Sequence, residues 1–289
     1  MAAAIALMTN RRLVFRLIAG HLLWSCALLG LWATGRLMEA PGLWWAALFL
    51  ALQLYAAGQL ILPVLLLHPF DRSRGFYLFR GLVLALSIWL INQVPPGEAW
   101  APLLTVIKSA LLLLVATLTG TVLARHITRL WEILPICLVM TLADLVSFFH
   151  GPTAGFAREI EQYYRVPEGP PPLIDMVLVK LVFPGSVGLA PVFGISDWIM
   201  VVFFAVVARR HGVNDNLFGA PGETLARKGG IGGYLPVSVA ALFAGTVLAQ
   251  ATGLFIPALP LIALIVLLWY AGRFLLLRRP GQKKGLNPL

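Results

Sequence analysis

The chain has 289 residues, of which 60% are hydrophobic and only 12% are charged. A soluble globular domain carries about 25% charged residues, so this composition excludes an ordinary soluble domain and a disordered chain. The net charge of +10 would suggest nucleic acid in a soluble protein, but here most Lys and Arg residues flank apolar runs, which is a signal of membrane topology. Cys26 and Cys137 lie inside such runs and are too few for a disulfide framework or a thiolate metal cage.

Eight apolar runs are long enough to cross a bilayer, which takes about 20 residues in a helix. In chain order they cover residues 13–33, 43–67, 76–94, 101–124, 131–149, 190–208, 234–252 and 256–277. The stretch 174–189 is short and contains Asp175, Lys180 and Pro184, so we interpret it as a partial or interfacial helix, with a ninth crossing as the alternative. The sequence therefore predicts an all-α, polytopic transmembrane helix bundle with about eight spans.

The distribution of basic residues predicts the orientation. With the N-terminus inside and eight crossings, 17 of the 22 Lys and Arg residues fall on the inner side, and the outer side holds Arg36, Lys108, Arg158, Arg165 and Lys180. An excess of Lys and Arg marks the cytoplasmic side of a membrane protein. We therefore expect a multi-pass integral membrane protein with both termini cytoplasmic. The short loops and the lack of an obvious targeting peptide favour a prokaryotic plasma membrane.

We divide the chain into N-terminal transmembrane helices, residues 1–100, and a second region, residues 101–289. The second region includes an outer loop, residues 150–189, which is the longest connection. Because this loop follows the fifth apolar run directly, we expect its 151–172 part and the 174–189 stretch to be mobile and to shield a site at the outer side.

Two acidic residues, Asp144 and Asp197, fall inside apolar runs. An acidic side chain in a spanning helix costs several kcal/mol and indicates a functional site by default. If the two helices end near Phe149 and begin near Ala190, both carboxyl groups lie roughly 8–10 Å below the outer end, at about 1.5 Å per residue. Paired carboxyls at one depth would share a proton, which suits an aspartic protease or a proton-relaying transporter cavity.

The last apolar run opens with Pro257-Ala258-Leu259-Pro260, on the same outer side as both aspartates. Two prolines in four residues interrupt helical hydrogen bonding. The backbone groups left unpaired are tolerated at membrane depth only where they face protein or a water-filled cavity. We therefore expect this motif to lie near the two carboxyl groups.

The motifs occur in the order found in the presenilin and signal peptide peptidase family of intramembrane aspartyl proteases, which residues 100–277 resemble. The resemblance implies that Asp144 and Asp197 are catalytic and activate water for attack on a peptide bond. It implies that an unwound substrate segment is held by the motif residues Gly194, Ser196, Pro257, Ala258 and Leu259. The implied substrates are single-span membrane proteins or signal-peptide remnants within the lipid bilayer, with no cofactor, metal or nucleic acid.

Ser196 departs from the family pattern, which has Gly-x-Gly-Asp where this chain has Gly194-Ile195-Ser196-Asp197. We expect the added side chain to reduce activity or to narrow the range of substrates. Two other functions remain open at this point: a carboxylate-lined transporter or channel, and a non-catalytic membrane scaffold. A transporter tends to show repeated halves with paired broken helices, and a scaffold would be free to lose either aspartate.

Overall fold

The computed structural model of the protein describes residues 2–38, 42–66, 74–94, 100–166, 171–186, 188–228, 230, 232–252 and 256–277. Over these residues the fold is α-helical apart from one two-stranded sheet. Several basic residues used above to predict the orientation lie outside the described residues, namely Arg72, Arg278, Arg279, Lys283 and Lys284.

All eight apolar runs contain a long helix, because a continuous apolar stretch buries its backbone groups best in helical hydrogen bonds. The helices are α1 (Ala2–Gly35), α2 (Leu43–Gln59), α4 (Arg74–Asn92), α5 (Ala101–Ala124), α6 (Ile133–His150), α8 (Ile195–Arg210), α10 (Val237–Thr252) and α11 (Ala258–Leu277). A short helix, α3 (Leu62–Leu66), follows α2 within the second run.

Four of the described helical segments are long and apolar enough to cross a membrane: Arg12–Gly35, Leu43–Leu65, Ala101–Ala124 and Leu130–His150. The last of these joins a 3₁₀ turn, η1 (Leu130–Glu132), to α6. Shorter apolar helical segments occur at Gly81–Asn92, Val237–Thr252 and Ala258–Arg273. These lengths and compositions indicate a membrane protein.

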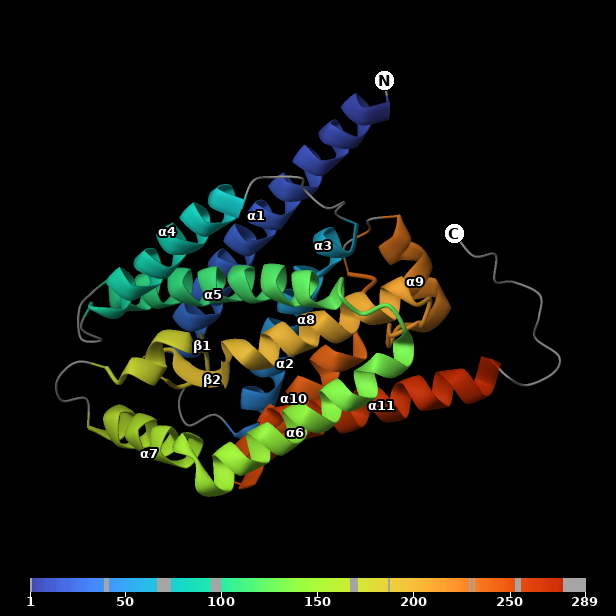
Figure 1. The fold of residues 1–289 in the computed structure, drawn as a ribbon. Coiled ribbons are helices and arrows are strands. Elements are labelled where there is room, and N and C mark those ends of the chain that lie inside the picture. The colour runs from blue at the N-terminus through green and yellow to red at the C-terminus, as the bar shows by residue number, and fades with distance from the viewer. Residues whose placement is uncertain are drawn as a thin grey trace.

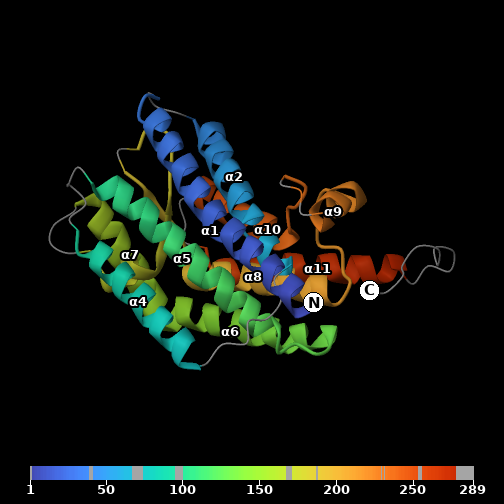
Figure 2. The ribbon, with the colours of Figure 1, turned by 90° about the horizontal axis from the view of Figure 1, so that it is seen from above.

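Two further helices lie at opposite ends of the molecule (Figures 1 and 2). Helix α7 (Pro152–Arg165) follows α6 at one end, and α9 (Gly219–Arg227) follows α8 at the other. Much of the outer loop that we expected to be a mobile connection is therefore helical. A short hydrogen bond of 2.5 Å between Ser147 Oγ and Thr153 Oγ1 ties the start of α7 to the end of α6.

The stretch 174–189, which we expected to be a partial helix, is helical only at its start. A 3₁₀ helix, η2 (Leu173–Val177), leads into strand β1 (Leu178–Leu181), which pairs antiparallel with β2 (Ala190–Gly194). The physical reason lies in the turn, where Pro184 would break a helix and Gly185 has a positive φ of 76°. This φ suits glycine and turns the chain back towards β2.

Side chains of two helices cap the outer edge of β1. Ser109 Oγ of α5 accepts from Lys180 N and donates to Lys180 O, both at 3.1 Å. The side chain of Gln53 on α2 bonds Val182 N at 2.8 Å and Val182 O at 2.9 Å. These bonds satisfy the backbone groups of Lys180 in β1 and of Val182 just after it. In the described chain no third strand covers the opposite edge of β2.

Helix α8 crosses the middle of the bundle (Figures 1 and 2) and packs against α5, α10 and α11. Its approach to α5 is close at Gly120, where an added Cβ would lie 2.4 Å from Ile199 O. Ser238 Oγ of α10 donates to Val201 O at 2.9 Å, and Tyr270 Oη of α11 donates to Phe204 O at 2.8 Å. Three neighbours therefore fix the position of α8.

Candidate functional site: two aspartates at the ends of three helices

Asp197 lies in the first turn of α8 rather than two turns inside it. We expected this helix to begin near Ala190, but residues 190–194 are used as strand β2, so α8 begins at Ile195. Asp197 then becomes the third helical residue, and its Oδ2 accepts a 2.9 Å hydrogen bond from the backbone N–H of Gly194. This satisfies one of the amide groups that a helix start leaves without a partner.

The residue after Asp197 anchors the start of α8 in the core. Trp198 is fully buried, and its Nε1 donates to Thr117 Oγ1 of α5 at 3.0 Å. Its ring also stacks on Phe193 of β2 with the centroids 6.0 Å apart. Because these contacts fix both the strand and the helix, they also fix the direction in which the Asp197 carboxyl points.

Asp144 is half-buried on α6, six residues before the end of that helix. Helix α6 packs against α11 and α7, and it contributes few buried side chains of its own. The Asp144 carboxyl interacts with the backbone N–H of Leu259, the second residue of α11. Asp144 therefore reaches across to the start of a neighbouring helix.

The Pro-Ala-Leu-Pro motif explains why that N–H is available. Helix α11 begins at Ala258, so Pro257 lies just before the helix and Pro260 lies in its first turn. The first N–H groups of any helix have no partner within the helix, and proline is tolerated there because it removes a donor that is not needed. The motif thus begins a helix and leaves the Leu259 N–H facing Asp144.

Three helices bring the predicted residues together. The carboxylates of Asp144 and Asp197 lie close enough for their charges to repel each other, and Leu259 lies beside Asp144. The positive ends of two helix dipoles, those of α8 and α11, therefore meet at the two carboxyl groups, which favours negative charge there.

The remaining predicted residues surround this point. Pro257 and Ala258 are half-buried, and Ser196 is exposed. A Cβ added at Gly194 would lie 3.3 Å from Ser196 Oγ and 3.6 Å from Asp197 Oδ2, so glycine keeps this approach open. Within the described chain Ser196 makes no hydrogen bond with Asp197, so the hydroxyl does not tune that carboxylate directly.

Reasoning from the sequence missed two buried polar clusters. One joins Lys108, Asp175 and Lys180, and both lysines were assigned from the sequence simply to the outer side. The second lies in the connection after α8, where Tyr234 Oη donates to both carboxylate oxygens of Asp215, at 3.1 and 3.3 Å. Burial raises the pKa of Asp215 to about 7. The only signal for the first cluster was a lysine inside an apolar run.

No group of three or more His, Cys, Asp or Glu side chains among the described residues is arranged to hold a metal ion. Comparison of the chain with family models, with curated proteins and with solved structures gives no match.

Proposed function

We propose that the protein is an intramembrane aspartyl protease resembling the presenilin and signal peptide peptidase family, with Asp144 and Asp197 as the catalytic pair. The observation that carries the proposal is that Asp144 interacts electrostatically with Asp197, in the first turn of α8, and with the Leu259 N–H at the start of α11. Asp144 and Leu259 are 115 positions apart in the sequence. No local helical pattern brings them together, so their proximity comes from the tertiary fold. Hydrolysis by such a pair needs no metal or cofactor.

The Asp144 and Asp197 carboxylates repel each other electrostatically. Like charges near one another cannot both ionise cheaply, so we propose that the pair holds one proton between its two carboxyls. The ionised member removes a proton from a water molecule as its oxygen attacks the carbonyl carbon of the substrate. The protonated member gives its proton to the departing amide nitrogen, and the carbon–nitrogen bond breaks. The Gly194 and Leu259 N–H groups hold Asp197 and Asp144, respectively, in position for these transfers.

Strand β2 is the proposed substrate-binding element. The edge of β1 is already occupied by Ser109 and Gln53, which leaves the edge of β2 for an added strand. An extended peptide gains main-chain hydrogen bonds by pairing with a free sheet edge. Because β2 ends at Gly194, such a peptide would run past Asp197. Single-span membrane proteins or signal-peptide remnants suit this site, because a helix must unwind before its peptide bonds are accessible.

We further propose a presenilin-like topology of eight crossings, made by α1, α2, α4, α5, α6, α8, α10 and α11, with both termini cytoplasmic. In support, α7 lies at one end of the bundle and α9 at the other (Figure 1). The α9 end carries Arg209 and Arg210, as the positive-inside rule requires of the cytoplasmic side. The aspartates then lie towards the outer leaflet.

The test is cleavage of a single-span reporter by the full-length protein reconstituted in vesicles. We expect Asp144→Asn and Asp197→Asn each to reduce the rate at least about 100-fold, the lower range for loss of acid–base catalysis. Glu159→Gln on the exposed face of α7 is the matched control and should retain the wild-type rate. Equal cleavage by wild type and both asparagine variants would refute the proposal.

The hydrogen bond from Gly194 supports one competing function, a non-catalytic scaffold in which Asp197 serves only to cap α8. Asparagine separates the two, because its side-chain oxygen still accepts the cap bond while it cannot take up the proton. A scaffold predicts that Asp197→Asn retains every measurable property of the wild type. A protease predicts a folded, inactive protein with an unchanged unfolding temperature.

A further inference from the structure

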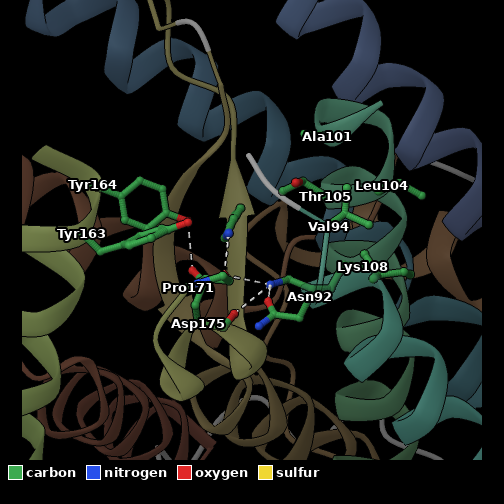
Figure 3. A pocket seen from close by; sticks show the side chains of 12 residues that line it. Asn92, Val94, Ala101, Leu104, Thr105, Lys108, Tyr163, Tyr164, Pro171 and Asp175 are labelled. Carbon is green, nitrogen blue, oxygen red and sulfur yellow. Dashed lines mark hydrogen bonds and ion pairs between the residues drawn. The ribbon is translucent and has the colours of Figure 1, made fainter. Parts of the chain in front are cut away.

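A second polar site lies where α4, α5, α7, η2 and β1 meet (Figure 3). Asp175 of η2 is at its centre, and the Lys108 and Lys180 ammonium groups contact Asp175 Oδ2 at 3.1 and 2.7 Å. Tyr164 Oη of α7 donates to Asp175 Oδ1 at 2.9 Å. Lys108, Asp175 and Lys180 are all less than 10% exposed, so this site is built into the protein interior.

The charges of this site do not balance. Among the described residues, two ammonium groups face one carboxylate, which leaves one excess positive charge in a buried place. Neither of the two neighbouring polar side chains, Asn92 and Tyr164, carries a negative charge to compensate. An uncompensated buried charge costs several kcal/mol, so a buried pair of lysines favours the uptake of an anion.

The hydrogen-bond donors are also in excess. Lys108 Nζ uses its three protons on Asn92 Oδ1, Asp175 O and Asp175 Oδ2. Lys180 Nζ has only Asp175 Oδ2 as an acceptor among the described residues, and lies 5.2 Å from the centre of the Tyr164 ring. The buried hydroxyl of Tyr163 has no hydrogen-bond partner in the described structure. Two donor groups therefore remain for an acceptor that the described residues do not supply.

A cavity of about 40 Å³ lies between these groups, and Lys108, Lys180, Asp175 and Tyr163 are among the residues that line it. A water molecule needs roughly 10–15 Å³ by this measure, so there is room for the oxygens of one small oxyanion. Its lining includes neither Asp144 nor Asp197, so it is separate from the proposed catalytic site.

We propose that this cavity binds a singly charged oxyanion group, held by the Lys180 ammonium and the Tyr163 hydroxyl. The shared chemistry is a small, negatively charged oxygen acceptor, supplied either by a free anion such as formate or by the phosphate of an anionic lipid. The bound group neutralises the excess charge of the two lysines and accepts the two remaining hydrogen bonds. This site does not depend on the proposed protease activity.

The first experiment measures the unfolding temperature of the full-length protein in a neutral detergent. Sodium formate is added at concentrations up to about 100 mM, and it replaces an equal concentration of the sodium salt of a bulky sulfonate so that the ionic strength stays constant. Because formate binds the folded protein, the midpoint should rise in a saturable manner by about 2 °C or more. A wild-type midpoint that responds neither to formate nor to the anionic lipid of the experiment below overturns the proposal.

Charge variants identify the site. Lys180→Gln leaves one lysine facing Asp175, so the charges balance and the anion response should disappear. Tyr163→Phe removes only a hydroxyl and should weaken the response with little effect on the fold. Lys228→Gln is the matched control, because it removes the same charge at an exposed position and should respond like wild type. An equal response in Lys180→Gln and wild type overturns the assignment.

The source of the oxyanion is determined in nanodiscs. One arm adds formate to discs of phosphatidylcholine, and the other replaces part of that lipid with phosphatidylglycerol without formate. A midpoint shift in the first arm assigns a free anion, and a shift in the second assigns a lipid phosphate. In either arm the shift must be lost in Lys180→Gln, and a shift that this variant retains counts against the site.

Discussion

The closest approach between two helices gives the sharpest prediction of stability. At Gly120 of α5 an added Cβ would lie 2.4 Å from Ile199 O, 3.0 Å from Val202 Cβ and 3.1 Å from Phe203 N. Two of these atoms belong to the backbone of α8, so no side-chain rotation relieves the clash. Ordinary contact begins at 3.4 Å, and Gly120→Ala therefore requires α5 and α8 to separate by about 1 Å.

The expected loss follows from two opposing effects. Overpacking of this kind costs about 3 kcal/mol at the upper end of its usual range, while replacing a helical glycine with alanine gains up to about 1 kcal/mol. The net loss of about 2 kcal/mol lowers the unfolding temperature by about 4–8 °C for a chain of this size. If Asp197 moves with α8, the proposed cleavage reaction should also slow by about 100-fold, because catalytic geometry tolerates little displacement.

The assay is thermal unfolding in detergent, followed by intrinsic fluorescence, with Gly30→Ala as the control. Gly30 lies in α1 with no atom within 4 Å of an added Cβ, so this variant gains helix propensity without a clash. Its midpoint should equal or exceed that of wild type. If Gly120→Ala unfolds at the same temperature as Gly30→Ala, the close packing of α5 against α8 is wrong.

Three further predictions concern other parts of the chain. Burial raises the pKa of Asp215 to about 7, so above about pH 4 the folded protein keeps a proton that the unfolded chain has lost. Stability should therefore fall as the pH rises from about 4 to about 7. The thermal midpoint of Asp215→Asn should lack this dependence on pH. Gln53→Leu leaves the N–H and C=O of Val182 without their partner and should lower the free energy of unfolding by about 1–3 kcal/mol, measured by chemical denaturation. Ser196→Gly should raise the cleavage rate or broaden substrate range in the reporter assay, and unchanged kinetics would show that the serine is neutral.

The helices were predictable because an apolar run of about 20 residues has few alternatives to a helix in a membrane. The hairpin was not, because the 174–194 region alternates neither in a helical nor in a strand period. Ser109 of α5 and Gln53 of α2 support the hairpin by bonding the backbone of Lys180 and Val182. These partners lie 71 and 129 residues away in sequence, beyond the reach of local pattern.

The start of α8 shows how such a long-range contact alters the expected site. Hydropathy alone extends this helix back to residue 190, which buries Asp197 two turns deep. Pairing of Ala190–Gly194 with β1 takes those residues out of the helix and places Asp197 in its first turn. The sequence alone marks Asp197 as a candidate, because it is an acid inside an apolar run. Its hydrogen bond to Gly194, in contrast, depends on tertiary structure.

The two aspartates differ in how the fold compensates for them. Asp197 lies at the N-terminal end of its own helix, where a carboxylate is stabilised by the dipole and by the Gly194 N–H. Asp144 lies towards the C-terminal end of α6, where its own helix offers no free donor, and its backbone partner comes from α11. Helix capping therefore accounts for Asp197 but gives no reason for an acid at Asp144. An acid that stabilises no helix of its own and is repelled by a second carboxylate raises the energy of the fold. This supports the proposed function, in which both carboxyls act together.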